Sequence, residues 1–414
     1  MSVGDTYFVG KLGTEPLAAL ALVFPLLMLL QMTSAGAMGG GVSSAIARAL
    51  GAGELAMARR LVLHALVIAA AMAAAFTLLM LGLGRPAYAL LGGRGATLEL
   101  ALAYSNIVFG GAAAVWLANT LASVLRGSGN MAVPATALVA AALVHLPLSA
   151  SLVLGLGPMP KLGIAGAALA YVSTFAIASA AMAAAVFRRS SPLRPQAGDL
   201  RLEARLFREI LRVGLVSVLS AVQTVLTAVI LTGMVGRFGA PALAGFGVGV
   251  RLELLQIPLV FAVGQALVAL VGTHVGAGQL ERAKRIAWTG AALACSASFA
   301  IGAAVWIHPL GWVGLFSADP GVLDAGTRYL RIVAPFFPFL ALGVALYFAA
   351  QGAGQVLRPV LAGTARLAII LAGSLAAAAA GALSLDTIFR LIAAAMLAFG
   401  ALSAWFVRRA RWVK

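Results

Sequence analysis

Two acidic side chains lie inside long apolar segments, where a charged group is costly. They are Asp5 and Glu253. The other acidic residues lie at or near predicted loops: Glu15, Glu54, Glu99, Asp199, Glu203, Glu209, Glu281, Asp319, Asp324 and Asp386. An ionisable group in hydrocarbon costs several kcal/mol unless it is paired or hydrated, and it commonly marks an ion or substrate pathway. We therefore expect Asp5 and Glu253 to handle a proton or a cation; for Asp5, a helix-end aspartate among solvated headgroups is the alternative.

A second set of polar residues could act together with Asp5. His145 and Ser149 are four residues apart in an apolar segment, so they share one face of a helix. An imidazole beside a carboxylate can pass a proton, whereas one carboxylate offers few of the oxygen ligands that Na⁺ requires. The hydroxyl of Tyr171 could reach the same cluster. Proton coupling through Asp5, His145, Ser149 and Tyr171 is the prediction; an interior hydrogen bond for His145 and simple packing for Tyr171 are the alternatives.

A third set surrounds Glu253. Arg251 and Glu253 lie about ten to twelve residues into an apolar segment, roughly 15 to 18 Å deep in a helix. Side chains two residues apart do not face each other on a helix, so each needs a different partner or a hydrated cavity. We expect Arg251, Glu253, Gln223 and Gln256 to line a substrate cavity, with Glu253 attracting cationic cargo. Structural neutralisation of the buried charges is the alternative.

The composition places these residues in a membrane. The chain has 414 residues, of which 62% are hydrophobic and only 10% are charged. One soluble core cannot enclose so much apolar surface. A helix crosses the hydrocarbon with about 20 apolar residues, and transmembrane strands would alternate polar with apolar residues. The sequence therefore predicts an all-α membrane protein with about eleven complete spans: 16–47, 57–83, 97–125, 131–156, 163–187, 209–236, 241–272, 283–307, 322–350, 357–382 and 385–407.

The segment before Gly10 is shorter than a span. Met1 to Val9 would extend only about 13 Å as a helix. The corresponding segment in the second half, 209–236, is long enough to cross. We expect the first helix to be truncated, either by a shortened sequence or by a wrongly chosen start codon.

The two halves of the chain repeat the same motifs in the same order, about 225 residues apart. The matched pairs are Val9–Gly13 with Val235–Gly239, Gly51–Gly53 with Gly276–Gly278, and Arg126–Gly129 with Gln351–Gly354. We expect an N-terminal bundle at 1–188, a cytoplasmic linker at 189–208 and a C-terminal bundle at 209–414. The linker region should end in a short amphipathic helix between Asp199 and Arg212.

Six helices per bundle return the chain to the side where it began, so the two copies share one orientation. Parallel repeats of this kind are related by a pseudo-twofold axis along the membrane normal. They leave a substrate site between the halves near mid-membrane, and rocking of the halves then gives alternating access.

The net charge is +17, and the basic residues are distributed as in a membrane protein rather than as in a nucleic-acid-binding protein. Basic residues concentrate in six segments, which the positive-inside rule places in the cytoplasm. These segments hold Arg59, Arg126, Arg205, Lys284, Arg358 and Arg411. The opposite side holds only Lys11, Arg85, Arg94, Lys161 and Arg237. This distribution argues against a nucleic-acid partner. The sequence also lacks a paired-acid catalytic motif, a glycine-rich phosphate loop and metal-ligand spacing, so we expect no enzyme activity, cofactor or metal.

Several motifs together resemble the MATE family, the multidrug and toxic compound extrusion transporters. They are Asp5–Gly13, Leu17–Ala19, Gly40–Ala45 leading into Gly51–Gly53, Leu125–Gly129 and Met159–Ala168. The resemblance covers essentially the whole chain. It implies twelve helices in two six-helix bundles and export of organic, often cationic, molecules driven by inward proton or sodium flow. Asp5 stands where the family's coupling aspartate stands.

The resemblance also favours one branch of the family. Sodium-coupled relatives of the NorM type carry a Glu in the seventh helix and an Asp in the tenth, whereas 217–232 and 334–352 contain no carboxylate here. The pattern is more similar to the DinF-type branch, whose coupling centres on the first-helix Asp. Relatives of that branch carry a pattern similar to Asn-x-x-x-Asp at the positions where this chain has His145 and Ser149. They often have Thr at the position of Tyr171.

The sequence therefore predicts a monomeric, proton-coupled exporter of organic cations in a bacterial inner membrane. One alternative is a Na⁺-coupled MATE exporter. Another is a lipid-linked saccharide flippase of the same superfamily, which should offer a cationic groove for pyrophosphate. The first bundle shows little deep charge beyond Asp5.

Overall fold

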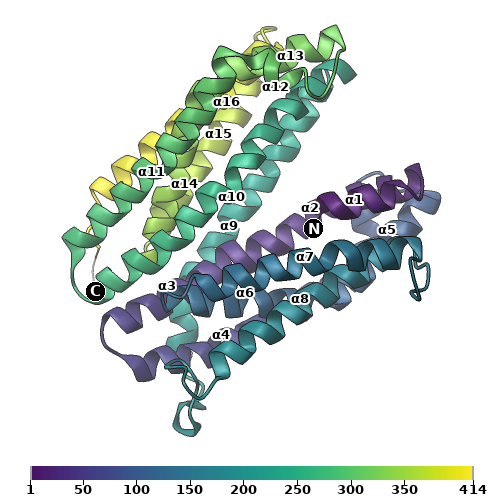
Figure 1. Cartoon of the computed structure of the whole chain (residues 1–414). Helices are drawn as coiled ribbons and strands as arrows, with labels where there is room; N and C mark the ends of the chain where they lie inside the picture. The colour runs from purple at the N-terminus through teal and green to yellow at the C-terminus, as the bar shows by residue number, and fades with distance from the viewer. Residues whose placement is uncertain (1, 413–414) are drawn as a thin grey trace. The chain divides into compact units, whose positions relative to one another are not determined.

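The computed structural model describes residues 2–412 (Figure 1), and these residues form helices and connecting turns without a β-strand. The predicted all-α class is confirmed. The α-helices are α1 (Ser2–Gly10), α2 (Thr14–Gln31), α3 (Gly39–Gly51), α4 (Leu55–Leu90), α5 (Gly95–Gly110), α6 (Ala112–Gly127), α7 (Ala132–Leu154), α8 (Ile164–Phe187), α9 (Ala204–Gly236), α10 (Ala240–Gly276), α11 (Leu280–Ile307), α12 (Pro309–Val313), α13 (Pro320–Val333), α14 (Phe337–Gly352), α15 (Leu357–Ala379) and α16 (Leu385–Arg408). A π-helix, η1 (Met32–Met38), joins α2 to α3, and two short 3₁₀ helices are η2 (Ala197–Asp199) and η3 (Ala334–Phe336).

The membrane spans agree with the apolar runs of the sequence. Within residues 2–412, ten helices are long and apolar enough to cross a membrane, or up to eleven if the bent pair α5 and α6 forms one span. This pair bends by 47° at Gly111, inside the span predicted at 97–125. α1 has nine residues. The chain is a multi-pass membrane protein.

The internal breaks in the spans coincide with particular local features. In the span that begins at Thr14, the hydroxyls of Thr33 and Ser34 donate to the carbonyl oxygens of Leu29 and Leu30, at the point where the π-helix begins. In the span that ends at Gly352, Pro335 lies within η3 and cannot donate a backbone hydrogen bond. Each break keeps the chain running across the membrane but redirects the side chains beyond it.

The chain forms two compact units. The first comprises residues up to 46 together with 54–214, and the second comprises 47–53 together with the residues from 215 onward. The separate amphipathic helix predicted between Asp199 and Arg212 is wrong, because α9 runs without interruption from Ala204 to Gly236. The helical periodicity of the amphipathic segment continues into the apolar span, so nothing in the sequence stops the helix at Arg212.

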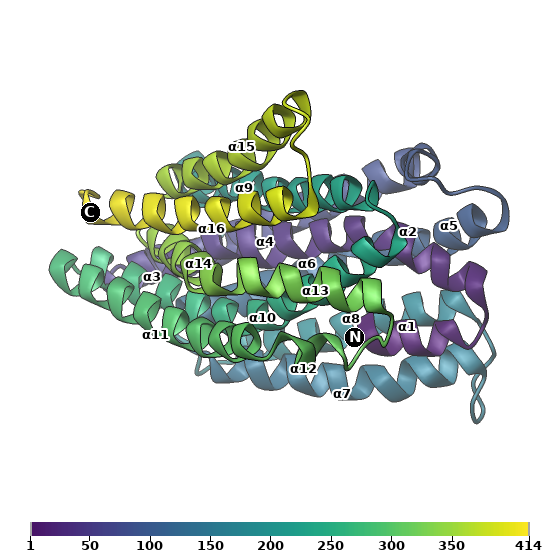
Figure 2. The ribbon, with the colours of Figure 1, turned by 90° about the horizontal axis from the view of Figure 1, so that it is seen from above.

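In the first unit, α8 packs against α5, α6 and α7, and α1 packs against α7. α7 and α8 lie side by side (Figure 2). Their close approach depends on Gly166, where an added Cβ atom would overlap the Leu152 carbonyl. This contact fixes the α7 face that carries His145 and Ser149.

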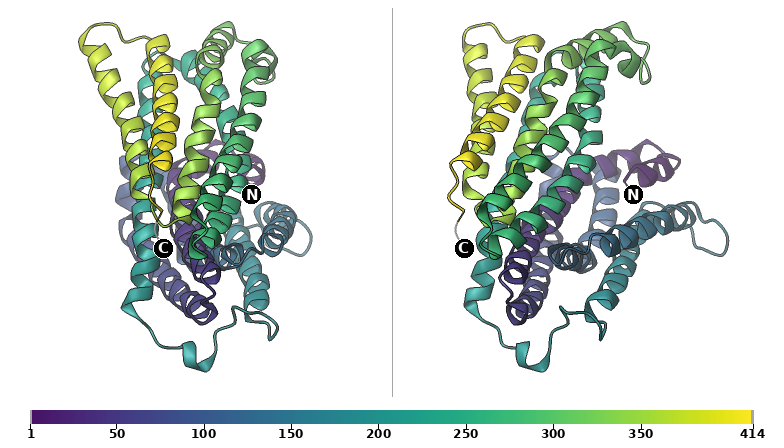
Figure 3. Two further views of the ribbon diagram at one scale, coloured as in Figure 1. Left: turned by 90° about the vertical axis from the view of Figure 1, so that its left-hand side faces the viewer. Right: turned by 60° about the vertical axis from the view of Figure 1, so that its left-hand side comes forward.

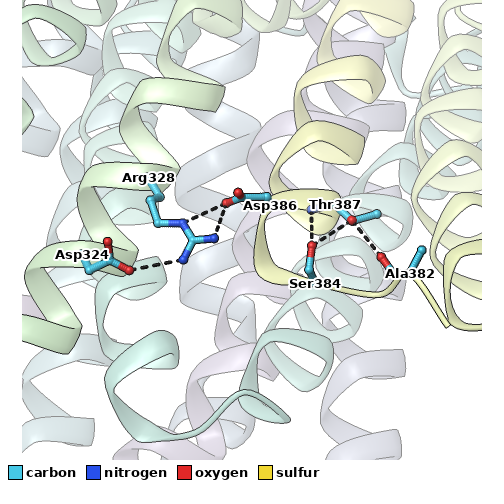
Figure 4. A network of polar contacts seen from close by, with 6 residues as sticks. All are labelled: Asp324, Arg328, Ala382, Ser384, Asp386 and Thr387. Atoms are coloured by element: carbon cyan, nitrogen blue, oxygen red, sulfur yellow. Dashed lines mark hydrogen bonds and ion pairs between the residues drawn. The ribbon is translucent and has the colours of Figure 1, made fainter.

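In the second unit, α14 packs against α10, α11 and α16, and α15 pairs with α16 (Figure 3). Arg328 of α13 holds α16 through its side chain, with Nε 2.9 Å from Asp386 Oδ1 and Nη1 3.3 Å from Asp324 Oδ2 (Figure 4). Ser384 caps α16 by accepting from the backbone N–H of Thr387 at 3.2 Å.

The repeated motifs in the two halves of the sequence have glycines with positive φ at equivalent positions. The matched glycines all have positive φ angles: Gly13 (124°) and Gly239 (98°), Gly53 (78°) and Gly278 (73°), Gly129 (84°) and Gly354 (73°). Left-handed backbone favours glycine because a Cβ atom is strained there. The sequence repeat is therefore a repeat of local structure, with equivalent turns after equivalent helices.

Candidate functional site

Asp5, His145 and Ser149 meet in the first unit. Asp5 Oδ1 lies 2.9 Å from His145 Nε2, and it accepts a hydrogen bond of 2.6 Å from Ser149 Oγ. All three residues are buried, with Asp5 only 3% exposed. The short α1 brings the carboxyl group to α7, and the four-residue spacing on α7 turns both partners toward it.

His145 also contacts a residue that the sequence analysis did not identify. Its Nδ1 lies 3.3 Å from Thr174 Oγ1 on α8. The Thr174 hydroxyl donates to the Ala170 carbonyl at 2.6 Å, so its oxygen is available to accept. His145 Nδ1 can then carry a proton, while Nε2 faces Asp5. The imidazole is therefore held on both sides, by Thr174 and by Asp5.

Tyr171 belongs to a neighbouring polar chain rather than to the Asp5 cluster. Gln31 Nε2 donates to the Tyr171 hydroxyl at 2.5 Å, and Asn119 Nδ2 donates to Gln31 Oε1 at 3.0 Å and to Ser34 Oγ at 2.8 Å. This chain begins beside the π-helix, which is a feature frequently found at functional sites. Tyr171 lies one turn before Thr174 on α8 and close enough to Asp5 for an electrostatic interaction.

The second unit holds a separate, partly buried polar cluster. The hydroxyl of Tyr329 on α13 donates to Glu253 Oε1 on α10. Gly249, one turn before Glu253, makes room for the tyrosine, because a Cβ atom there would overlap the Tyr329 ring. Arg366 of α15 interacts electrostatically with Glu253 and has its guanidinium carbon 6.0 Å from the Phe399 ring centroid. Glu253 thus has a hydrogen-bond partner on α13 and an electrostatic partner on α15.

The four residues predicted to line a substrate cavity have different neighbours. Arg251 is exposed, with its guanidinium carbon 5.5 Å from the Phe316 ring centroid. Gln223 is buried and donates to Thr364 Oγ1 at 2.7 Å. Gln256 is buried and donates to a carbonyl of its own helix. Arg251 and Glu253 have separate partners, as their spacing indicates, and the structure brings no two of the four side chains into a hydrogen bond.

Three partners escaped the sequence analysis for different reasons. Thr174 is one hydroxyl in an apolar helix, and such residues usually bond their own backbone. Tyr329 is an aromatic residue in an amphipathic segment, where packing is the ordinary explanation. Arg366 is a charged residue inside a predicted span, and such a residue usually has an acidic partner. The sequence alone does not show that this partner is Glu253.

No metal site is formed by the part of the chain that the structure describes. Among residues 2–412, no group of three or more His, Cys, Asp or Glu side chains could hold a metal ion.

Comparison with known proteins identifies the family. The MatE family model matches residues 1–150 and 217–375. The chain belongs to the MATE family. MATE proteins are membrane transporters of small molecules and not enzymes, and this applies to the chain as well.

The relatives of this MATE protein have low sequence identity to it but align with most of its length. A protein named FAD transporter from Shewanella oneidensis is 28% identical over 356 residues, which are 84% of this chain and 76% of the relative. A probable multidrug resistance protein NorM from Deinococcus radiodurans is 28% identical over 351 residues, covering 80% of this chain and 73% of the relative. A solved MOP superfamily transporter from Pyrococcus furiosus has a TM-score of 0.91 at 23% identity, covering 98% of this chain and 90% of that one. That structural likeness confirms the MATE-type fold.

Proposed function

We propose that this MATE transporter exports organic cations in exchange for protons, and that Asp5, His145 and Ser149 form its proton site. The observation that supports the proposal is the placement of His145 Nε2 and Ser149 Oγ on one buried oxygen of Asp5. Burial makes the charge of this cluster energetically important, since an ion in a low-dielectric environment needs compensation. The binding or release of one proton therefore changes the net charge of the cluster in a buried position, where that change has a large energetic effect.

The proton count of the cluster gives a mechanism. With the exchangeable proton, Asp5 and His145 are either an ion pair or two neutral groups, and the cluster has no net charge. Without it, an ionised Asp5 beside a neutral His145 leaves one negative charge. An organic cation can compensate that charge, but it competes with the proton for it. Such competition is the requirement for antiport, and it favours cationic cargo.

The donor set disfavours Na⁺ at this site. Sodium prefers several oxygen ligands, and the cluster offers the Asp5 carboxylate with the hydroxyls of Ser149 and Thr174. The remaining group in contact with the cluster is the His145 ring, whose Nδ1 and Nε2 contact Thr174 and Asp5. A ring nitrogen does not supply the further oxygen ligand that Na⁺ prefers, whereas an imidazole can exchange a proton with a carboxylate.

The membrane orientation and assembly state belong to the same proposal. The basic segments around Arg59, Arg126 and Arg205 face the cytoplasm of a bacterial inner membrane, by the positive-inside rule and in line with the bacterial relatives. The chain acts as a monomer, because the duplicated units are already contained in one polypeptide.

Reconstituted transport tests the proposal. Purified protein is reconstituted into liposomes that are loaded with a fluorescent cationic dye. Dye export is measured under an imposed pH gradient and then under a sodium gradient. We expect the pH gradient alone to drive export and Asp5→Asn to abolish it. Asp386→Asn, in the surface ion pair with Arg328, is the control and should keep full transport. Transport driven by sodium alone, or full transport by Asp5→Asn, would refute the proton site.

A second candidate cargo is an anionic flavin nucleotide. The relative named FAD transporter suggests it, and Arg126 provides an observation in this chain. Arg126 is buried, its Nε donates to the Ala122 carbonyl at 3.1 Å, and no carboxylate among the described residues pairs with it. Export of FAD that exceeds export of the cationic dye in the same liposomes, and that Arg126→Gln reduces, would favour this cargo.

A further inference from the structure

We propose that a cavity in the first unit binds a phosphate-bearing anion at the cytoplasmic surface. The cavity has a volume of about 490 Å³ and lies between the start of α4 and the segment that follows α8. Its lining includes Leu55, Arg59, Arg189, Ser191, Arg194 and Gln196. Small-molecule pockets commonly have volumes of about 300–1,000 Å³, so the space suits a headgroup or a phosphorylated metabolite.

The charge of the cavity is entirely positive. Arg59, Arg189 and Arg194 contribute guanidinium groups, and no acidic residue belongs to the lining. In the described part of the chain, none of these three side chains forms an ion pair, and the buried Nε of Arg59 lacks a hydrogen-bond partner. Guanidinium groups bind phosphate through paired N–H donors. Three unpaired arginines around one cavity therefore point to a phosphate group as the missing partner.

The two carboxylates of the segment that follows the cavity have other partners. Arg60 Nη1 lies 2.7 Å from Glu203 Oε1, and Arg60 Nε lies 3.7 Å from Asp199 Oδ1. Asp199 also accepts from the backbone N–H of Gln196 at 3.0 Å. Asp199 and Glu203 therefore pair with Arg60 and not with the arginines that line the cavity.

The segment that carries the arginines is held in place. The Ser191 N–H donates to the Arg188 carbonyl at 3.0 Å, and Leu193 is buried at 2% exposure. Downstream, the Glu203 N–H donates to His64 Nε2 of α4 at 2.8 Å. The cavity is therefore bounded by a segment attached to α4, and a phosphate would connect Arg59 on α4 with Arg189 and Arg194 on that segment.

The chemistry allows two sources of phosphate. One is the headgroup of an anionic phospholipid, which the inner leaflet presents at the same surface. The other is a soluble phosphate compound. Both would use the three guanidinium groups, with Ser191 and Gln196 as further donors, so the experiment must distinguish them. The inference does not depend on proton coupling at Asp5.

Thermal denaturation of the full-length protein in neutral detergent tests the site. The midpoint is measured with dioctanoyl phosphatidylglycerol, with dioctanoyl phosphatidylcholine and with inorganic phosphate. We expect phosphatidylglycerol to raise the midpoint and phosphatidylcholine to have no effect. The variant Arg59→Gln/Arg189→Gln/Arg194→Gln should bind phosphatidylglycerol at least about tenfold more weakly, because charge-assisted hydrogen bonds are lost. Stabilisation by inorganic phosphate alone, lost in this variant, would assign the site to a soluble phosphate.

A matched control separates the cavity from general surface charge. Arg205 is an exposed arginine at the start of α9 and does not line the cavity. Arg205→Gln should bind the lipid as the unmodified protein does. If the triple variant is misfolded, the single variant Arg194→Gln and hydrogen exchange of residues 188–203 with and without lipid give the same comparison. Equal lipid binding by the cavity variants and Arg205→Gln, or equal stabilisation by both lipids, would overturn the proposal.

Discussion

Asp5 Oδ1 and His145 Nε2 lie 2.9 Å apart although 140 residues separate them in the sequence. The carboxylate can only accept a hydrogen bond, and the imidazole can donate or accept depending on its protonation. One proton position between the two atoms therefore determines the charge of the pair. Replacing His145 removes the proton acceptor, whereas replacing Ser149 removes only a donor to the carboxylate, so the two changes should have different effects.

His145→Gln tests the role of the imidazole. A glutamine amide can still donate to Asp5, but it cannot take up a proton. We expect pH-driven dye export to fall at least about tenfold, since positioned proton carriers commonly contribute 10²–10⁴-fold to proton-transfer steps. The matched control is His308→Gln, an exposed histidine at the start of α12, which should keep normal transport. Unchanged transport by His145→Gln would show that the imidazole has only a structural role.

Ser149→Ala tests the second donor to Asp5. The serine hydroxyl stabilises the ionised carboxylate through its 2.6 Å hydrogen bond. A hydrogen bond to a charged group contributes about 1.5–3 kcal/mol, but Asp5 keeps His145 as a partner when this bond is lost. We therefore expect pH-driven dye export to fall less in Ser149→Ala than in His145→Gln. Initial export rates of both variants in matched liposomes give the comparison, and an equal or larger loss in Ser149→Ala would contradict the separate role of the imidazole.

The spans and the shared face of His145 and Ser149 could be predicted because apolar runs and a four-residue spacing are local patterns. No local pattern indicates that Asp5 meets this face, since 140 residues separate Asp5 from His145. The π-helix was not predictable in this way, because it coincides with Thr33 and Ser34 hydrogen bonds to the backbone that an unbroken helix would also allow. The partner of Glu253 was not predictable either, since Tyr329 reaches it from 76 residues away through tertiary packing.

Gly249→Ala tests that packing. The added Cβ would overlap the Tyr329 ring, which Phe246 and Phe389 hold from other sides at centroid distances of 5.5 and 5.1 Å. Overpacking a well-packed interior costs about 1–3 kcal/mol, so the denaturation midpoint in detergent should fall. Gly247→Ala on the same helix is the control, because nothing lies within 4 Å of its added Cβ. Equal midpoints for the two variants would contradict the ring position.

Arg328→Ala should have a small effect despite the two ion pairs in Figure 4. The side chains of Arg328 and Asp386 are 40% and 35% exposed. Partly exposed ion pairs contribute about 0–1 kcal/mol and are screened by salt. We expect a slightly lower denaturation midpoint at low ionic strength and no difference at 1 M NaCl, where the Debye length is about 3 Å. A large loss of stability at both salt concentrations would show that Arg328 has a packing role.

His64→Ala tests the attachment of the segment before α9. His64 is fully buried, its Nδ1 lies 2.7 Å from the Arg60 carbonyl, and its Nε2 accepts from the Glu203 N–H. Because a carbonyl only accepts, Nδ1 carries the proton and Nε2 is free to accept. Removing the ring leaves the Glu203 N–H without this acceptor, which costs about 1–3 kcal/mol. Hydrogen exchange at Glu203 should therefore accelerate about 5- to 150-fold, while amides of α15 keep their rate. Uniform acceleration in both units would indicate global destabilisation instead, and an unchanged Glu203 rate would show that the imidazole does not hold this segment.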